Sequence, residues 1–333
     1  MHRVIDEQSL AESSVDADLA REMLTDMVRA RVFDEKAVAL QRRGWMSGYP
    51  PFSGQEASQV GAAHALDGDD WLFPTYRSNA MQFARGVPMS DILLFRRGYP
   101  EFHSDHDVPV FPQAIPIATQ LPHAVGVGMA ADYGDDDRVS MAYFGDGATS
   151  EGDFHEAMNF AGVFDAPVVF FCENNHWAIS RPANRQTASE SIAVKADAYG
   201  FDGIRVDGND PLAVYEIVSS AREYAPALIE SLTYRQGAHT TSDDPSRYRD
   251  EDPDLPEWRT ADPIDRFADY LREEGAIETG FLEDARAEAS EEVDAAVETA
   301  EDHAEADPDE MFTSAYETIP PRVEEQRASI SRE

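Results

Sequence analysis

Residues 138–177 constrain the fold of this chain more than any other segment. Residues 139–144 and 168–172 are short apolar runs rich in β-branched and aromatic side chains, which is typical of buried strands. Between them, Ser150 with Asp153 indicates a helix start, and Pro167 would end that helix. Its buried face would carry apolar residues at i, i+3, i+4 and i+7, namely Phe154, Ala157, Met158 and Ala161. A strand–helix–strand unit of this kind predicts a parallel sheet.

Glycines and polar residues follow both predicted strands. Gly145, Asp146 and Gly147 come after the first strand, and Asn174 and Asn175 come after the second. The carboxyl ends of parallel strands meet at one edge of a sheet, where open α/β sheets bind ligands. Carboxylate and amide oxygens suit Mg²⁺, and the glycines would let backbone amides approach phosphate oxygens at a helix start just after Gly147. The segment therefore predicts a site for a metal-bridged diphosphate.

These residues also carry a family resemblance. Gly-Asp-Gly alone is more often a tight turn, but here 26 residues and an Asn-Asn pair follow it, which resembles the thiamine diphosphate motif. The longer string GDGATSEGDFHEAMNFAGVF resembles the alpha subunit of the decarboxylating component of 2-oxo acid dehydrogenase complexes. The resemblance extends over roughly residues 18–275. It implies an α/β fold, a doubly wound parallel sheet with helices on both faces that binds thiamine diphosphate and Mg²⁺.

The resemblance also implies roles for residues outside this unit. In the family a Tyr-Arg pair, here Tyr76 and Arg77, contacts the diphosphate, and a bulky aliphatic residue, here Ile117, lies under the cofactor. A histidine on a loop that closes over the cofactor, here His239, contacts the substrate and is the expected catalytic residue. Thr240 matches a hydroxyl residue that is phosphorylated in animal members. The other implied cofactor-binding residues are Gly145, Asp146, Gly147, Ala148 and Asn175.

The implied metal shell combines side-chain and backbone oxygens. Asp146 and Asn175 would supply side-chain ligands, and Trp177 matches a position whose backbone carbonyl completes the shell. Some branched-chain members have an arginine where this chain has Glu173, so that phosphate contact is absent here. The glutamate that activates the cofactor ring is expected on a partner chain. Glu56, in the string GQEA, is therefore not expected to play that role.

Composition narrows the class of protein. The net charge is −38 with only two lysines, which argues against nucleic-acid binding, while 42% hydrophobic residues argue for a folded core. An acidic, lysine-poor globular chain is typical of salt-loving organisms. The chain has no apolar run of about 18 residues, so no membrane span is predicted. Residues 1–10 do not resemble a secretory signal. A single cysteine, Cys172, in a predicted buried strand suits the reducing cytoplasm.

Three regions are expected along the chain. They are an N-terminal helical segment at residues 1–50, a thiamine diphosphate-binding α/β domain at 51–260 and a C-terminal helical acidic arm at 261–333. Within the central region, Asp210 and Pro211 predict an N-cap and first helical residue, and residues 233–249 predict a polar loop.

The resemblance implies oxidative decarboxylation of pyruvate or a branched-chain 2-oxo acid, with transfer of the acyl group to a lipoyl-bearing acyltransferase. Only one half of such a site is found in this chain. A beta subunit would supply the other half, most simply in an α₂β₂ heterotetramer. An acetoin dehydrogenase-type thiamine enzyme has the same motifs and stays open as an alternative. A nicotinamide-binding dehydrogenase would need a Gly-x-Gly-x-x-Gly turn, which is not found in the right place. A non-catalytic acidic interaction protein would not need these motifs together.

Overall fold

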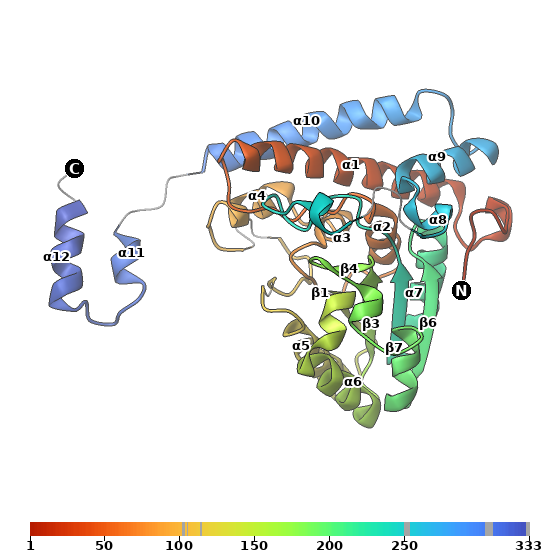
Figure 1. Cartoon of the computed structure of the whole chain (residues 1–333), viewed down its shortest axis with the longest axis horizontal. Helices are drawn as coiled ribbons and strands as arrows, with labels where there is room; N and C mark the ends of the chain where they lie inside the picture. The colour runs from red at the N-terminus through yellow and green to blue at the C-terminus, as the bar shows by residue number, and fades with distance from the viewer. Residues whose placement is uncertain (102–103, 105, 114, 250–253, 304–308, 331–333) are drawn as a thin grey trace.

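Five parallel strands form the central sheet of the computed structural model (Figure 1). The structure describes residues 1–101, 104, 106–113, 115–249, 254–303 and 309–330. In spatial order the strands are β1 (Trp71–Phe73), β2 (Ser140–Gly145), β3 (Val168–Asn174), β7 (Ala227–Leu232) and β6 (Asp202–Asp207). The two strands predicted at residues 139–144 and 168–172 are β2 and β3, and their ends agree with the prediction to within two residues.

Helices cover both faces of this sheet, which confirms the doubly wound α/β prediction. Alternate strand residues point to opposite faces, so Met141 and Tyr143 of β2 belong to one hydrophobic cluster, and Ala142 and Phe144 to another. The first cluster includes residues of α2 and α7, and the second includes residues of α5, α6 and η4. These elements are α2 (Glu56–His64), α7 (Pro211–Arg222), α5 (Gln120–Tyr133), α6 (Gly152–Phe164) and η4 (Ala193–Tyr199).

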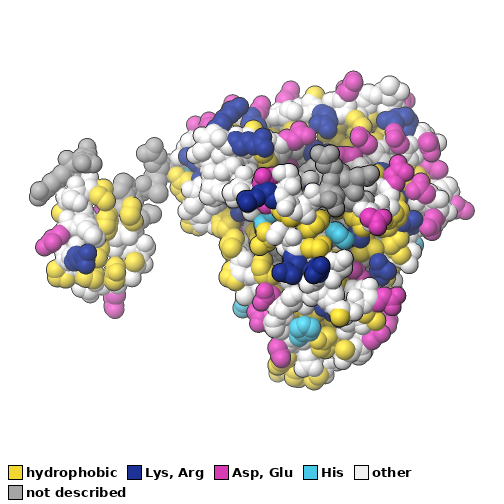
Figure 2. Space-filling view, viewed as in Figure 1, with side chains coloured by type: hydrophobic (Ala, Val, Ile, Leu, Met, Phe, Trp, Pro, Cys, Tyr) yellow, Lys and Arg dark blue, Asp and Glu magenta, His cyan; other side chains and the backbone are white. Residues whose placement is uncertain are grey.

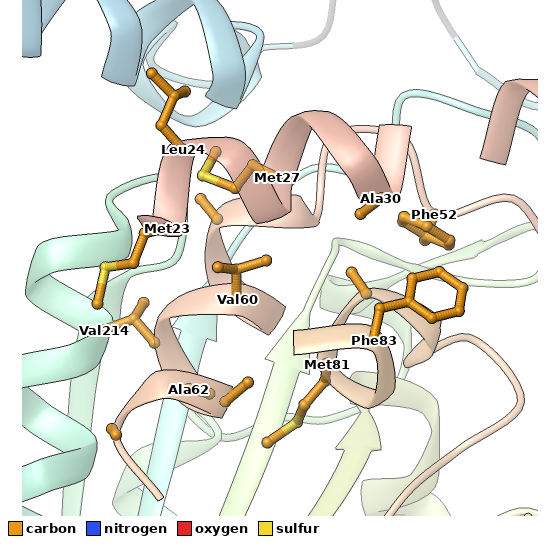
Figure 3. Close-up of a cluster of buried hydrophobic side chains, with 14 of the residues drawn as sticks. Met23, Leu24, Met27, Ala30, Phe52, Val60, Ala62, Met81, Phe83 and Val214 are labelled. Carbon is orange, nitrogen blue, oxygen red and sulfur yellow. The ribbon is translucent and has the colours of Figure 1, made fainter. Parts of the chain in front are cut away.

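A further layer of helices shares the first core. The long helices α1 and α10 run side by side across the top of Figure 1. Met23, Met27 and Ala30 of α1 are buried in this cluster with Val60 of α2 and Phe83 of α3, which Figure 3 shows in close-up. The N-terminal helix α1, the sheet and the helices α9 and α10 thus share one hydrophobic core. The helices of this layer are α1 (Ala17–Arg42), α3 (Asn79–Ala84), α4 (Met89–Arg96), α9 (Pro263–Glu273) and α10 (Phe281–Glu301), and the short helix α8 (Glu257–Thr260) precedes α9.

Short elements complete the described chain. Figure 1 places α11 and α12 apart from the rest of the protein. The remaining elements are η1 (Leu10–Glu12), η2 (Asp146–Ser150), β4 (Trp177–Ala178), β5 (Arg181–Pro182), η3 (Ala183–Arg185), η5 (Pro245–Arg247), α11 (Glu310–Thr313) and α12 (Pro321–Ile330).

Aspartate side chains cap the N-termini of three of the described helices. Asp16, Asp210 and Asp262 each accept hydrogen bonds from two backbone N–H groups of the first turn of α1, α7 and α9. The predicted N-cap at Asp210 is therefore confirmed. Asp210 also accepts from the backbone N–H groups of Val4 and Ile5, both at 2.7 Å. One buried carboxylate thus stabilises α7 and holds the N-terminal segment beside it.

The turn after β2 differs from the sequence prediction. The chain first forms the 3₁₀-helix η2, in which the Thr149 hydroxyl donates to the Asp146 carbonyl at 2.8 Å. The α-helix begins only at Gly152, so Ser150 is not its N-cap, and Glu151 takes that position without a side-chain bond. At the other end, Asp165 adopts a left-handed conformation (φ 53°) and ends α6 two residues before Pro167. A 3₁₀ turn therefore separates β2 from α6, where the sequence predicted that the strand would lead directly into an α-helix.

Acidic side chains are scattered over the surface in Figure 2, mainly along its upper and right-hand parts. None of the described helices is long and apolar enough to cross a membrane. Because the net charge is −38, we expect the folded chain to repel itself in dilute buffer, whereas at about 1 M salt the Debye length falls to about 3 Å. The midpoint of thermal unfolding, measured by circular dichroism, should therefore rise strongly with potassium chloride concentration. A midpoint that stays constant from low to molar salt would contradict this.

Candidate active site

A cavity of about 530 Å³ opens at the carboxyl ends of β2 and β3. All ten residues that the sequence analysis assigned to the site line this cavity, although they come from five separate segments of the chain. They are Tyr76, Arg77, Ile117, Gly145, Asp146, Gly147, Ala148, Asn175, Trp177 and His239. The cavity is therefore one place where the predicted diphosphate, metal and catalytic residues meet.

The predicted metal ligands are held by neighbouring side chains. Asn175 donates through Nδ2 to Gln55 Oε1 at 2.8 Å and accepts from the Trp177 backbone N–H through Oδ1 at 3.1 Å. The Trp177 carbonyl accepts from Arg235 Nη1 at 3.3 Å. Asp146 is 2% exposed, and burial raises the pKa of its carboxyl to about 6. These contacts hold Asn175 and Trp177 in place, and all three oxygen-bearing groups line the cavity.

The two asparagines of the Asn-Asn pair have different positions. Asn175 lines the cavity, whereas Asn174 is buried behind it and donates to Glu230 Oε1 at 2.8 Å. The Asn174 carbonyl accepts from Arg259 Nη2 at 2.9 Å. Asn174 therefore anchors the end of β3, and Asn175 is the member of the pair that can reach a ligand.

Gly147 lies against a short hairpin formed by β4 and β5. A Cβ atom at this position would lie 2.9 Å from the Cβ of Ala178, closer than side chains pack. Ala178 belongs to β4, which pairs antiparallel with Arg181 and Pro182 of β5. Glycine at this position allows the hairpin to cover the turn that carries Asp146.

Two arginines hold His239 in its neutral form. The His239 Nδ1 lies 3.0 Å from Arg77 Nη2 and 3.2 Å from Arg235 Nη1, and the His239 carbonyl accepts from Arg77 Nη2 at 2.8 Å. Burial and these two positive charges lower the pKa of His239 to about 3. Guanidinium groups only donate, so Nδ1 is the acceptor and the ring proton is assigned to Nε2. His239 is therefore a hydrogen-bond donor at neutral pH, not a titrating acid.

Arg235 is a cavity-lining residue that the sequence analysis did not assign. Its side chain is fully buried, and its Nε has no hydrogen-bond partner among the described residues. Burial and the neighbouring arginines lower its pKa to about 10. The sequence could have indicated this role, because Arg235 follows the end of β7 by three residues and so lies at the same sheet edge as Asp146. Arg77 and Arg235 together give the cavity two positive charges, which suits an anionic ligand.

Glu56 is held away from the cavity by an ion pair. Its Oε1 accepts from Arg31 Nε at 2.6 Å and its Oε2 accepts from the Gly54 backbone N–H at 2.9 Å. Arg31 also pairs with Asp262 at 2.7 Å. Glu56 does not line the cavity, in agreement with its exclusion as a catalytic acid.

Three buried carboxyl groups in and around the cavity have raised pKa values. Burial raises the pKa of Asp34 to about 7, of Asp146 to about 6 and of Glu173 to about 8. A carboxyl whose pKa is higher in the folded state adds stability that is complete below its unfolded pKa, near 4, and is lost as the pH rises through the folded pKa.

We therefore expect the unfolding midpoint of the cofactor-free protein to fall as the pH rises from about 5 to about 8. Calorimetry in molar salt would measure this trend with the surface repulsion screened. The Glu173→Gln variant, which keeps the shape of the side chain without the charge, should show a smaller fall. A midpoint that increases over this range would contradict the assignment.

Similarity to known proteins agrees with the geometry of the cavity. The sequence profile of the family described as "Dehydrogenase E1 component" matches residues 24–309. The chain is 45% identical to the 3-methyl-2-oxobutanoate dehydrogenase subunit alpha of Mycobacterium tuberculosis, covering 92% of this chain and 85% of that protein. It is 38% identical to the pyruvate dehydrogenase E1 component subunit alpha of Bacillus cereus, covering 97% and 88%. The corresponding Staphylococcus epidermidis subunit is 36% identical, covering 98% and 91%. The chain therefore belongs to the dehydrogenase E1 component family.

Proposed function

We propose that this chain is the alpha subunit of a thiamine diphosphate-dependent 2-oxo acid dehydrogenase. It would oxidatively decarboxylate pyruvate or a branched-chain 2-oxo acid and pass the acyl group to a lipoyl-bearing acyltransferase. The observation that carries the proposal is the single cavity lined by all ten predicted residues. Relatives named for both substrates support the reaction class, and the acetoin alternative gains no support from them.

The residues around the cavity fit thiamine diphosphate with Mg²⁺. No group of three or more His, Cys, Asp or Glu side chains suited to a metal occurs in the part of the chain that the structure describes. A cation here would therefore use the Asp146 carboxylate, the Asn175 amide oxygen and the Trp177 carbonyl, together with phosphate oxygens. Such a mixed oxygen shell is what Mg²⁺ prefers. Arg77, Arg235 and the glycine turn at Gly145 and Gly147, all of which line the cavity, would receive the diphosphate.

When bound, the cofactor supplies an electron sink for decarboxylation. The residues of this chain bind, orient and shield it. Arg77 and Arg235 offset the charge of the diphosphate, and Ile117, which is 43% exposed at the cavity, offers an aliphatic surface to the rest of the cofactor. His239 presents an Nε2–H donor to the substrate. Preorganised donors of this kind need no reorganisation when charge develops during the reaction.

An exposed apolar surface on α5 and α6 is the proposed contact with a beta subunit or a second alpha chain. Phe160, Val163 and Phe164 of α6 are 48%, 68% and 49% exposed. Gly126 and Ala130 are exposed small residues on the neighbouring helix α5. Obligate interfaces commonly bury about 2,000–5,000 Å² and are apolar at the centre. We propose an α₂β₂ assembly, in the cytoplasm, where the buried, unpaired Cys172 would stay reduced.

The chain alone should be inactive, because it supplies residues for only one side of the cofactor. The test is to purify it with and without its beta subunit and to measure decarboxylation with an artificial electron acceptor. Pyruvate, 3-methyl-2-oxobutanoate and acetoin should be compared on the assembled enzyme. Full activity of the isolated chain would refute the shared site, and activity with acetoin alone would refute the 2-oxo acid assignment.

A further inference from the structure

A glutamine from the segment after the β4–β5 hairpin contacts the predicted metal ligand. Gln186 Nε2 donates to Asp146 Oδ2 at 2.6 Å, although the two residues are 40 positions apart in the chain. This bond engages one of the two carboxylate oxygens. A carboxylate has about four acceptor sites, so Asp146 Oδ1 is left as a ligand atom while Oδ2 is held in place.

The same amide group also bonds to the hairpin. Gln186 Nε2 donates to the carbonyl of Arg181 in β5 at 3.2 Å. The base of the hairpin is closed by a bond from the Ala183 N–H to the His176 carbonyl at 2.9 Å. Ala178 in turn packs against Gly147, so the hairpin covers the turn that carries Asp146. Gln186 thus links the hairpin to the carboxylate beneath it.

The second polar atom of this side chain is unused. Gln186 Oε1 is buried and has no hydrogen-bond partner among the described residues. A buried acceptor without a partner costs free energy. A water molecule on a bound Mg²⁺, which usually keeps several waters, is a donor that would satisfy it.

We propose that Gln186 is a positioning residue of the metal site, which orients the Asp146 carboxylate and couples metal binding to closure of the β4–β5 hairpin. This inference rests on the proposed function. Partners that hydrogen-bond to metal ligands orient them, and their loss typically weakens metal binding by about 10- to 100-fold.

The first test measures metal affinity on the enzyme assembled with its beta subunit. Mg²⁺ is titrated in the presence of thiamine diphosphate, and binding is followed by calorimetry. The Gln186→Leu variant keeps a similar volume but has no amide, so its Kd for Mg²⁺ should rise about 10- to 100-fold. The matched control is Asn184→Leu, which removes an exposed amide two residues away and should leave the Kd unchanged. An unchanged Kd in Gln186→Leu, or a lower one, would overturn the proposal.

The second test needs no variant and follows the hairpin itself. Arg185 is exposed and directly precedes Gln186, so trypsin can report on this segment. Mg²⁺ with thiamine diphosphate should slow cleavage after Arg185 in the wild-type enzyme, and should slow it less in Gln186→Leu. Equal cleavage rates with and without the metal in the wild type would overturn the coupling even if the variant does not fold.

The Asp146→Ala variant separates this inference from the proposed function. If Asp146→Ala binds Mg²⁺ and thiamine diphosphate normally, the assignment of the metal site to Asp146 is wrong. If Asp146→Ala loses binding while Gln186→Leu retains it, only the role of Gln186 is refuted.

Discussion

Replacing Asp146 by alanine should abolish Mg²⁺-dependent binding of thiamine diphosphate. Asp146 is the only carboxylate among the three groups proposed to hold the metal, and a hard cation depends on such an oxygen ligand. Its burial means that water cannot replace it easily. Calorimetry on the assembled enzyme would measure binding, with circular dichroism to establish that the variant is folded.

Two further substitutions make this result specific. Asp146→Asn keeps the shape of the side chain and one ligand oxygen but not the charge, so it should retain weak binding. Asp153→Ala removes an exposed carboxylate on α6 that does not line the cavity, and it should bind as the wild type does. Normal cofactor binding by Asp146→Ala would refute the metal assignment.

His239→Ala should lower kcat by about 10²- to 10⁴-fold, the usual contribution of a positioned histidine, while thiamine diphosphate still binds. The two arginines on Nδ1 keep the ring neutral and direct its single proton to Nε2. The lost interaction is therefore a hydrogen bond to the substrate. Steady-state kinetics together with a cofactor titration would separate the loss of turnover from a loss of binding.

A pair of amide variants tests which nitrogen matters. The glutamine amide in His239→Gln can reach the position of Nε2, whereas the shorter asparagine amide in His239→Asn reaches only that of Nδ1. We expect the glutamine variant to be the more active of the two. Equal activity of both variants would refute the role of Nε2 as the donor. Near-normal activity of His239→Ala would show that His239 has no catalytic role.

Local patterns predicted the elements whose signal lies within a short stretch of sequence. The strands flanking Gly-Asp-Gly and the cap at Asp210 depend on neighbours in the chain, and the structure has them where they were expected. Gly145, Asp146, Gly147 and Asn175 were found because strand ends of a parallel sheet share one edge. The family resemblance added Tyr76, Ile117 and His239, which composition alone would have assigned to core or loop.

The residues that the sequence did not reveal act through contacts between distant segments. The bond between Gln186 and Asp146 spans 40 positions, and that between Arg259 and the Asn174 carbonyl spans 85. No periodicity or spacing encodes such pairs. The 3₁₀ turn at Asp146 was missed for a different reason, because its hydrogen bonds depend on the exact path of the glycine turn.

The buried ion pair between Arg31 and Glu56 and the acidic surface respond differently to the surrounding solution. Arg31 and Glu56 are buried, so dissolved ions do not reach them as they reach the exposed carboxylates. Changes in ionic strength should therefore alter the repulsion between surface carboxylates, and with it the stability of the fold. They should alter the electric field around the reacting groups much less. Evolution could then exchange surface residues to match a new habitat while the chemistry inside stays as it is.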